Sequence, residues 1–162
     1  MRISHKVDYG VRAMVALARA ATEDAETPVP RDTLAARNGI PPKFLDDILR
    51  ELRTAGLARS RRGSVGGWTL GRPAGEITVA DVVRALDGPL ASVRGIRPHH
   101  LAGAGVEPAL VTLWVAVRSA LRSVLEVVTV ADLAAGTLPD SIQEWAAGPG
   151  AWDAPSPPAP PR

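Results

Sequence analysis

The stretch ARSRRGSVGGWTL, residues 58–70, places three arginines and three glycines between two short strand-like runs. Guanidinium groups bind phosphates, and an arginine that enters a narrow minor groove of DNA gains from the negative potential there. Glycines remove side-chain bulk and permit a positive φ, so we expect Gly63, Gly66 and Gly67 to bring the tip close to a sugar–phosphate wall. Taken in isolation, the same stretch is typical of a solvated hairpin whose arginines solubilise an edge.

A charged stripe precedes this hairpin, on a helix that Pro41-Pro42 is predicted to open and that is predicted to stop near Gly56. Lys43 and Arg50 could contact phosphates or guanine edges, and Asp46 or Asp47 could accept from a cytosine amino group. The alternative is an ordinary charged outer face, on which neighbouring acids and bases support each other. The apolar residues that form the buried side are Leu45, Ile48, Leu49 and Leu52.

The helices and strands around them must position the hairpin arginines and the charged helix stripe. Residues 2–21 predict a helix because apolar residues recur at helical spacing, and a short helix over 31–37 ends in an Asn-Gly turn. The runs 57–61 and 68–71 can pair around the glycine-rich tip. A helix, a tight turn, a helix with a polar face and a basic hairpin form the order of a winged helix-turn-helix, whose second helix enters the major groove.

The second half of the chain predicts a helical extension. The tetrapeptide TVAD begins a helix at 78–81 and again at 129–132, and residues 88–108 between them predict a long loop. Residues 109–128 predict the longest helix, which is apolar around much of its circumference, so we expect a second subunit to cover it. The candidate dimerisation residues are Leu110, Leu113, Trp114, Val117, Leu121, Val124 and Leu125.

Composition excludes several classes of chemistry. No cysteine occurs among the 162 residues, which excludes disulfides, cysteine-ligated iron–sulfur clusters and cysteine nucleophiles. The three histidines lack catalytic spacing, so we expect no enzyme. Charged residues interrupt the apolar runs and the N-terminus is no secretory signal, so we expect a cytoplasmic protein without a membrane partner. Residues 1–75 hold 13 Lys or Arg against 8 Asp or Glu, which suggests an anionic partner for this half.

Three stretches together resemble the Rrf-two family of bacterial winged-helix transcription regulators: MRISHKVDYGVRAMVALA, GIPPKFLDDILRELRTAGLARSRRG and GGWTLGRPAGEITVADVVRALDG. The resemblance implies a homodimer built on the long helix, with each protomer bound to one half of a roughly two-fold operator in double-stranded DNA. By position, Lys43, Phe44, Asp46 and Asp47 match the base-contacting stretch of the family, Arg62 its minor-groove arginine, and Ser4 and Lys6 its phosphate-contacting start. Further candidate DNA contacts are Arg31, Arg50, Arg61 and Ser64.

The loop between the two halves departs from the family. Sensing members hold three cysteines there and bind an iron–sulfur cluster, whereas this chain has VRGIRPHHLAGAGVEP. We therefore do not expect this chain to sense through an iron–sulfur cluster, as those family members do, and we expect no cofactor. His99 and His100 could join other side chains around a metal ion, but adjacent histidines in an extended loop point apart, so a plain loop is favoured. Arg94 and Arg97 beside Trp114 could line a pocket for an anionic or aromatic effector, or anchor the loop by salt bridges.

The sequence therefore predicts a mainly α fold with a small β-hairpin. We expect a winged helix-turn-helix over residues 1–88, an effector or linker loop over 89–108, and a dimerisation helix with a short C-terminal helix over 109–147. The tail, 148–162, has six prolines and is expected to be disordered. The predicted function is that of a sequence-specific transcriptional regulator, a repressor that is constitutive or responds to a small molecule. A winged-helix module that binds proteins is the alternative.

Overall fold

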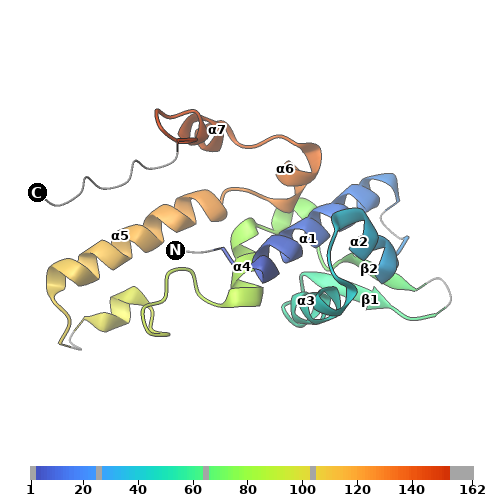
Figure 1. The fold of residues 1–162 in the computed structure, drawn as a ribbon, viewed down its shortest axis with the longest axis horizontal. Coiled ribbons are helices and arrows are strands. Elements are labelled where there is room, and N and C mark those ends of the chain that lie inside the picture. The colour runs from blue at the N-terminus through green and yellow to red at the C-terminus, as the bar shows by residue number, and fades with distance from the viewer. Residues whose placement is uncertain (1–2, 25–26, 64–65, 103–104, 154–162) are drawn as a thin grey trace, which may run out of the picture.

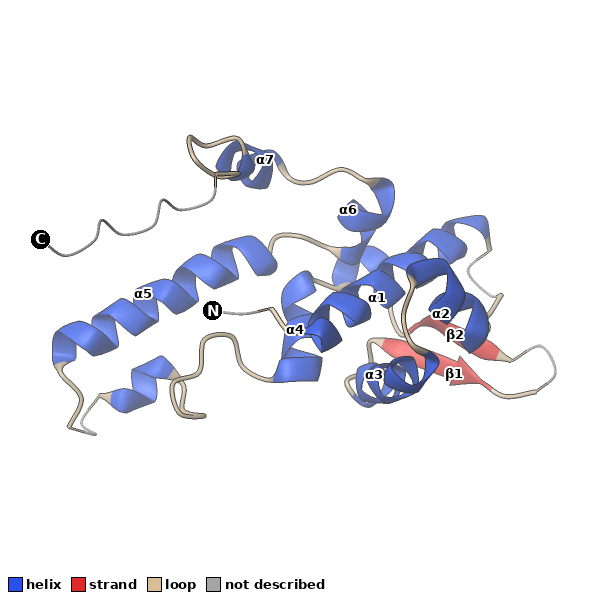
Figure 2. Cartoon of the chain, in the orientation of Figure 1, coloured by secondary structure: helices blue, strands red, loops and turns tan. Residues whose placement is uncertain are grey.

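The computed structural model describes residues 3–24, 27–63, 66–102 and 105–153. The fold is mostly helical with one two-stranded antiparallel hairpin, which confirms the expected class (Figures 1 and 2). The elements in chain order are α1 (His5–Glu23), α2 (Arg31–Asn38), α3 (Pro42–Thr54), β1 (Ala58–Arg61), β2 (Gly67–Leu70), η1 (Ala74–Glu76), α4 (Val79–Asp87), η2 (Pro98–Leu101), α5 (Pro108–Leu125), α6 (Val130–Ala135) and α7 (Asp140–Ala146).

The first helix starts later than the apolar pattern predicts, because Ser4 caps it. The Ser4 hydroxyl accepts from the backbone N–H of Val7 at 3.1 Å. With 19 residues, α1 is one residue longer than α5, so the expectation that residues 109–128 form the longest helix is wrong. The difference arises at the end of α5, where the chain turns after Leu125 into the segment that leads to α6.

The core joins α1 to the helix-turn-helix. Gly39, with a φ of 62°, ends α2 in the left-handed conformation that favours glycine, and the chain re-enters a helix at Pro42. The side chains that were expected to lock α2 against α3 are all buried, and each is at most 2% exposed: Leu34, Ile40, Leu45 and Leu49.

A third segment, at Val29, pairs with the hairpin, and the sequence did not predict this contact. Ser60 lies opposite Trp68 in the ladder, and Trp68 also pairs with Val29 through two backbone hydrogen bonds of 2.9 Å. A Cβ at Gly67 would lie 2.5 Å from the Val29 carbonyl oxygen. Gly67 is therefore required by the chain itself, and its predicted close approach to DNA stays a prediction. Of the three tip glycines, Gly63 has the positive φ, 117°.

The chain leaves the winged-helix unit after α4 and returns to it before α6. Both TVAD segments form capping boxes, and Thr78 at the start of α4 pairs with Thr129, where the chain returns, as a β-bridge. Val130 is completely buried, and α6 packs against α1. We call residues 3–87 together with α6 the body, and residues 88–128 the arm. In Figure 1 the arm lies at the end of the molecule opposite to the hairpin.

The arm buries little of its apolar surface. None of the 18 residues of α5 is buried. By length and composition this helix could cross a membrane, with a mean hydropathy of 1.3. Arg118 and Arg122 interrupt its apolar sequence, as expected, and one helix that passes this test is weak evidence for a membrane span.

Candidate nucleic-acid interface

The two sides of α3 differ sharply. Its four apolar side chains are at most 1% exposed, whereas Lys43, Phe44, Asp47 and Arg50 are exposed on the other side. Phe44 is 61% exposed, which is unusual for an aromatic residue in a folded domain. The Arg50 guanidinium donates to Asp47 at 3.0 Å, which is the neighbouring pair that the sequence suggested.

Hollows flank this helix on both sides. A cavity of about 450 Å³ lies between α1 and α3 and is lined by His5, Tyr9 and Phe44 among others. A smaller cavity of about 190 Å³ separates α3 from the hairpin, between Asp46 and Trp68. The helix therefore stands out from its surroundings, and the flanking space matches the way that phosphate backbones border a helix in a major groove.

Two of the predicted phosphate contacts already have partners within the chain. The Lys6 ammonium donates to Glu51 at 2.7 Å and to the Leu86 carbonyl oxygen at 2.9 Å, so that it joins α1 to α3 and to the end of α4. Arg31 donates to Asp32 at 2.7 Å and to Asp46 at 2.8 Å.

These pairings have consequences for both charges. Hydrogen bonds to Asp32 and then to Asp46 raise the pKa of Arg31 above its ordinary value. The Asp46 carboxylate is held by Arg31 across the turn between α2 and α3. Of the two acids considered for a cytosine contact, Asp47 is the more exposed.

The hairpin presents its cations outward. Arg59, Arg61 and Arg62 are exposed, and no carboxylate partner is found for them within the described ranges. Trp68 is half-buried and packs against the core, so it fills the junction between hairpin and body, as the sequence suggested. Ser4 is used as the cap of α1, and Ser64 lies outside the described residues.

The arm loop is more structured than the sequence predicted. Pro98–Leu101 form a 3₁₀ helix, η2, and Val93 pairs with Ile96. The expectation that the two histidines point apart is wrong: the rings of His99 and His100 meet edge to face with centroids 4.2 Å apart. Over residues 3–24, 27–63, 66–102 and 105–153, no group of three His, Asp or Glu side chains could hold a metal ion.

Of the predicted effector residues, Arg97 lines a cavity, but its companions there are not those expected. Arg84 and Arg118 share this cavity, whereas Arg94 and Trp114 are not among its lining residues. Sequence reasoning missed Arg118. The available signal was its i, i+4 spacing with Arg122, which gives an apolar helix one charged side.

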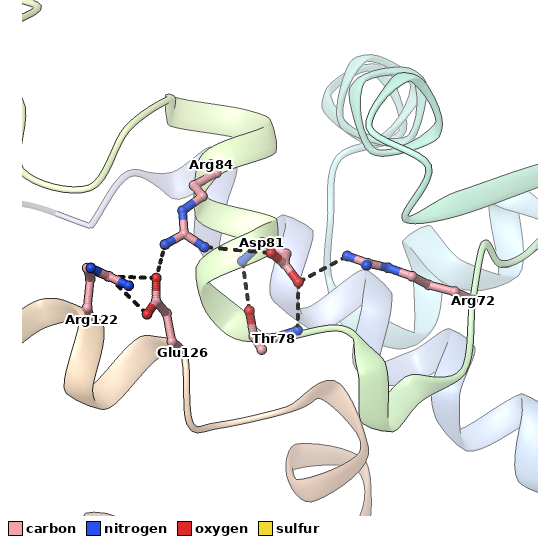
Figure 3. A network of polar contacts seen from close by, with 6 residues as sticks. All are labelled: Arg72, Thr78, Asp81, Arg84, Arg122 and Glu126. Atoms are coloured by element: carbon pink, nitrogen blue, oxygen red, sulfur yellow. Dashed lines mark hydrogen bonds and ion pairs between the residues drawn. The ribbon is translucent and has the colours of Figure 1, made fainter. Parts of the chain in front are cut away.

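Sequence reasoning also missed a polar network that joins the arm to the body (Figure 3). Glu126 accepts from Arg122 at 2.9 Å and from Arg84. Asp81 contacts Arg84 at 3.7 Å, and it accepts from Arg72 at 3.0 Å just after the hairpin. The pKa of Glu126 lies below its ordinary value, first because of the hydrogen bond from Arg122 and then because of that from Arg84.

The predicted dimerisation residues divide into two groups. Leu110, Leu113 and Val117 are exposed, and Leu113 is 52% exposed. The remaining members are half-buried, and those in the second half of α5 line an apolar cavity of about 460 Å³ together with α1 and α4. The members that line this cavity are Leu121, Val124 and Leu125.

Comparison with known proteins is consistent with this geometry. Residues 3–136 match the family profile of Rrf2, described as iron-dependent transcriptional regulator. The chain is 53% identical over 146 residues to Rv1287 of Mycobacterium tuberculosis, which is named as an HTH-type transcriptional regulator, with 90% of this chain and 89% of that one covered. It is 35% identical over 144 residues to the HTH-type transcriptional regulator CymR of Bacillus subtilis, covering 89% and 96%.

Solved structures show the same fold. CymR of B. subtilis, titled the global cysteine regulator, matches with a TM-score of 0.69 at 34% identity, covering 85% of this chain and 98% of that one. IscR of T. potens matches with a TM-score of 0.67 at 31% identity, covering 84% and 88%.

The iron in the family description does not fit this donor set. The chain has no cysteine to supply thiolates, and the described part of the chain gathers no alternative set of metal ligands. The match itself extends over the hairpin, the helix-turn-helix, the arm and α6. The chain is a transcriptional regulator and not an enzyme, and it belongs to the Rrf2 family.

Proposed function

We propose that this protein is a repressor that binds a two-fold operator sequence-specifically as a homodimer, in the cytoplasm, without an iron–sulfur cluster. Each protomer inserts α3 into the major groove of one half-site and places the hairpin arginines against the adjoining minor groove. Repression follows from occupancy, because a dimer on a promoter blocks access to the same DNA.

The observation that carries this proposal is the exposed face of α3. A helix whose inner leucines are fully buried holds its outer face rigidly. Lys43, Asp47 and Arg50 are displayed there next to hairpin arginines that have no carboxylate partner among the described residues. Rigid display of donors and acceptors is what direct contact with base edges requires. The Lys6 and Arg31 ion pairs support the same proposal by fixing α3 against α1 and α2.

The exposed side of α5 supports the homodimer. Leu110, Leu113 and Val117 repeat at helical spacing on a side of α5 that the described part of the chain leaves exposed. Exposed apolar stripes of this kind are typical of protein interfaces. A second copy would cover the stripe isologously, and this arrangement generates the two-fold axis that a palindromic operator needs.

The test begins with selection of bound fragments from genomic DNA by the full-length protein, followed by fluorescence anisotropy on the selected duplex. We expect Arg62→Ala to weaken binding at least about tenfold across sites, because a charge-assisted contact is lost. The matched control is Arg94→Ala, which removes an exposed arginine of the arm that does not line a cavity with Arg97. Lys43→Ala should instead change which duplexes are preferred.

Salt distinguishes the protein-binding alternative. Phosphate contacts release counterions, so the affinity of the wild type should fall steeply as salt rises, and Arg62→Ala should reduce that slope by about one. An affinity for duplex that is independent of salt, or equal in Arg62→Ala and wild type, would overturn the proposed role of the hairpin and favour a protein-interaction module.

A further inference from the structure

A cavity of about 390 Å³ lies where the arm meets the end of α4, away from the hairpin and α3. It is lined by Arg84 of α4, by Gly88, Pro89 and Leu90 of the loop that follows, by Arg97 before η2 and by Arg118 of α5. Its volume is within the range of sites that hold small ligands. Three arginines from separate parts of the chain therefore converge on one space.

The positive charge in this cavity is only partly compensated. Arg84 is paired with Asp81 and Glu126. Arg97 and Arg118 have no carboxylate partner anywhere in the described part of the chain, although both face the same cavity. The neighbouring His99 shows the effect: desolvation, followed by the charges of His100, Arg118 and Arg97, lowers its pKa below the ordinary value.

Guanidinium groups gathered in this way suit a particular ligand chemistry. Two arginine forks can each give paired N–H donors to a phosphate or carboxylate, and such charge-assisted bonds are stronger than neutral ones. Leu90, which is buried, and Pro89 supply an apolar wall beside them. We propose that this cavity is an effector site for a small oxyanion, a metabolite that carries phosphate or carboxylate groups.

The loop that forms one wall is held in an unusual conformation. Ala91 and Arg94 have positive φ values of 50° and 53°, which side chains other than glycine adopt rarely. Such strain persists only where the surrounding structure imposes it, and it gathers at ligand clamps and switch regions. Burial of Leu90 on one side and of Pro98 on the other fixes the loop here.

Position favours a small anion over the DNA backbone as the occupant. The arm extends away from α3 and the hairpin, at the opposite end of the molecule (Figure 1). A duplex bound by α3 and the hairpin therefore leaves this cavity free. The arginines of the hairpin and those of the cavity act on two different anions.

The cavity is also connected to the hairpin. Arg84 lines it and is at the same time the centre of the network in Figure 3, between Glu126 of the arm and Asp81, which holds Arg72 at the end of the hairpin. An anion that recruits Arg84 competes with Glu126 and Asp81 for this guanidinium and so loosens the contact between the arm and α4, while Asp81 keeps its bond to Arg72. This coupling rests on the proposed DNA binding, whereas the anion site does not.

The site is tested on the full-length protein without DNA. Isothermal titration with inorganic phosphate and, separately, with citrate, at constant ionic strength set by sodium chloride, should give saturable binding of one or both. Arg118→Ala and Arg97→Ala should each weaken binding at least about tenfold, and Arg118→Lys should weaken it less, because it keeps the charge and loses the fork. Arg37→Ala, which removes an exposed arginine of α2, is the matched control.

Several results would overturn the site: no saturable binding of either anion, or equal affinities in wild type, Arg97→Ala and Arg118→Ala. Thermal melts of each variant identify any that fails to fold, and the remaining arginine variant then carries the test. Preference for phosphate over citrate, or the reverse, identifies which oxyanion the metabolite carries.

The coupling is tested by measuring operator affinity with and without a saturating concentration of the preferred anion at constant ionic strength. We expect the anion to weaken operator binding in wild type and to have no effect in Arg118→Ala. If Arg97→Ala and Arg118→Ala weaken operator binding in the absence of the anion, the cavity is a DNA-backbone contact and the effector site is wrong. An unchanged operator affinity together with intact anion binding overturns the coupling alone.

Discussion

The helices α3 and α5 both carry leucines at helical spacing, but they use them in opposite ways. In α3, Leu45, Leu49 and Leu52 are fully buried, and the polar side faces outward. In α5 no residue is buried, and Leu113 is 52% exposed. The comparison shows that periodicity identifies which side of a helix needs burial but not whether the same chain provides the cover. The body completes its own core, whereas the arm leaves an apolar side of α5 exposed, which the proposed second copy would cover.

The largest effect is expected in the core of the body. Leu49→Ala should lower the free energy of unfolding by about 2–5 kcal/mol, because it leaves a cavity among closely packed side chains. Urea denaturation followed by circular dichroism measures this. The control on the same helix is Phe44→Ala, which should change stability by less than about 0.5 kcal/mol. Equal losses in the two variants would show that the outer side of α3 is buried and would remove it as a DNA-contacting face.

A smaller effect on folding but a clear one on assembly is expected in the arm. Leu113→Glu should raise the dissociation constant of the dimer at least about 100-fold, because an unpaired carboxylate would be buried against the second copy. Ser119→Glu adds the same charge on the opposite side of α5 and should leave the dimer intact. Sedimentation velocity at micromolar concentration measures both. A monomeric wild type, or a dimeric Leu113→Glu, would contradict the comparison.

Leu113 rather than Leu121 is the residue to change, and the sequence alone could not decide between the two. Leu121 has the same spacing as Leu113 and Val117, but in the structure it lines a cavity with α1 and α4. A charge there would disturb the chain's own packing as well as the dimer. Helical spacing places the three residues on one side, and only the tertiary fold shows that this side faces α1 and α4 at the end of α5.

Features encoded locally were predicted well. The turn at Gly39, the two capping boxes and the separation of polar from apolar residues in α3 each depend on residues within about one turn of one another. Contacts between distant segments were not predictable. Val29 on Trp68, Lys6 on Glu51 and the convergence of Arg97 with Arg118 depend on how helices pack, and a single sequence carries no local signal for that.

The helix caps on either side of the arm allow a comparison of smaller effects on the free energy of unfolding. Thr78→Ala removes the cap of α4, the helix before the arm, and Thr129→Ala removes the cap of α6, the helix after it. Each should lower the free energy of unfolding by about 1 kcal/mol. Thr112→Ala, within α5, should cost little, because alanine is the better helix former. Urea denaturation of all three tests this. A loss in Thr78→Ala without one in Thr129→Ala would mean that α6 unfolds separately from the body.

The smallest expected effect is on the pH dependence of stability, and it arises from charged groups of the arm. The body pairs Lys6 and Arg31 with carboxylates, whereas the arm leaves Arg97 and Arg118 near His99 without such partners in the described ranges. Because the pKa of His99 is lowered from 6.5, the unfolded chain binds its proton more readily, and the associated stability is lost as pH falls below about 6.5. His99→Gln should therefore flatten the dependence of stability on pH in this window.

Nuclear magnetic resonance titration of the imidazole measures the same property directly. Arg118→Ala should move the pKa of His99 back toward its ordinary value, because the charge of Arg118 is one of the causes that lower it, whereas Arg37 is not among these causes and Arg37→Ala should leave the pKa where it is in the wild type. Saturating phosphate should raise the pKa in the wild type, since an anion between the arginines favours the imidazolium form. A pKa of His99 that responds to neither change would mean that the cations of the arm are screened, and the contrast in charge between arm and body would then disappear.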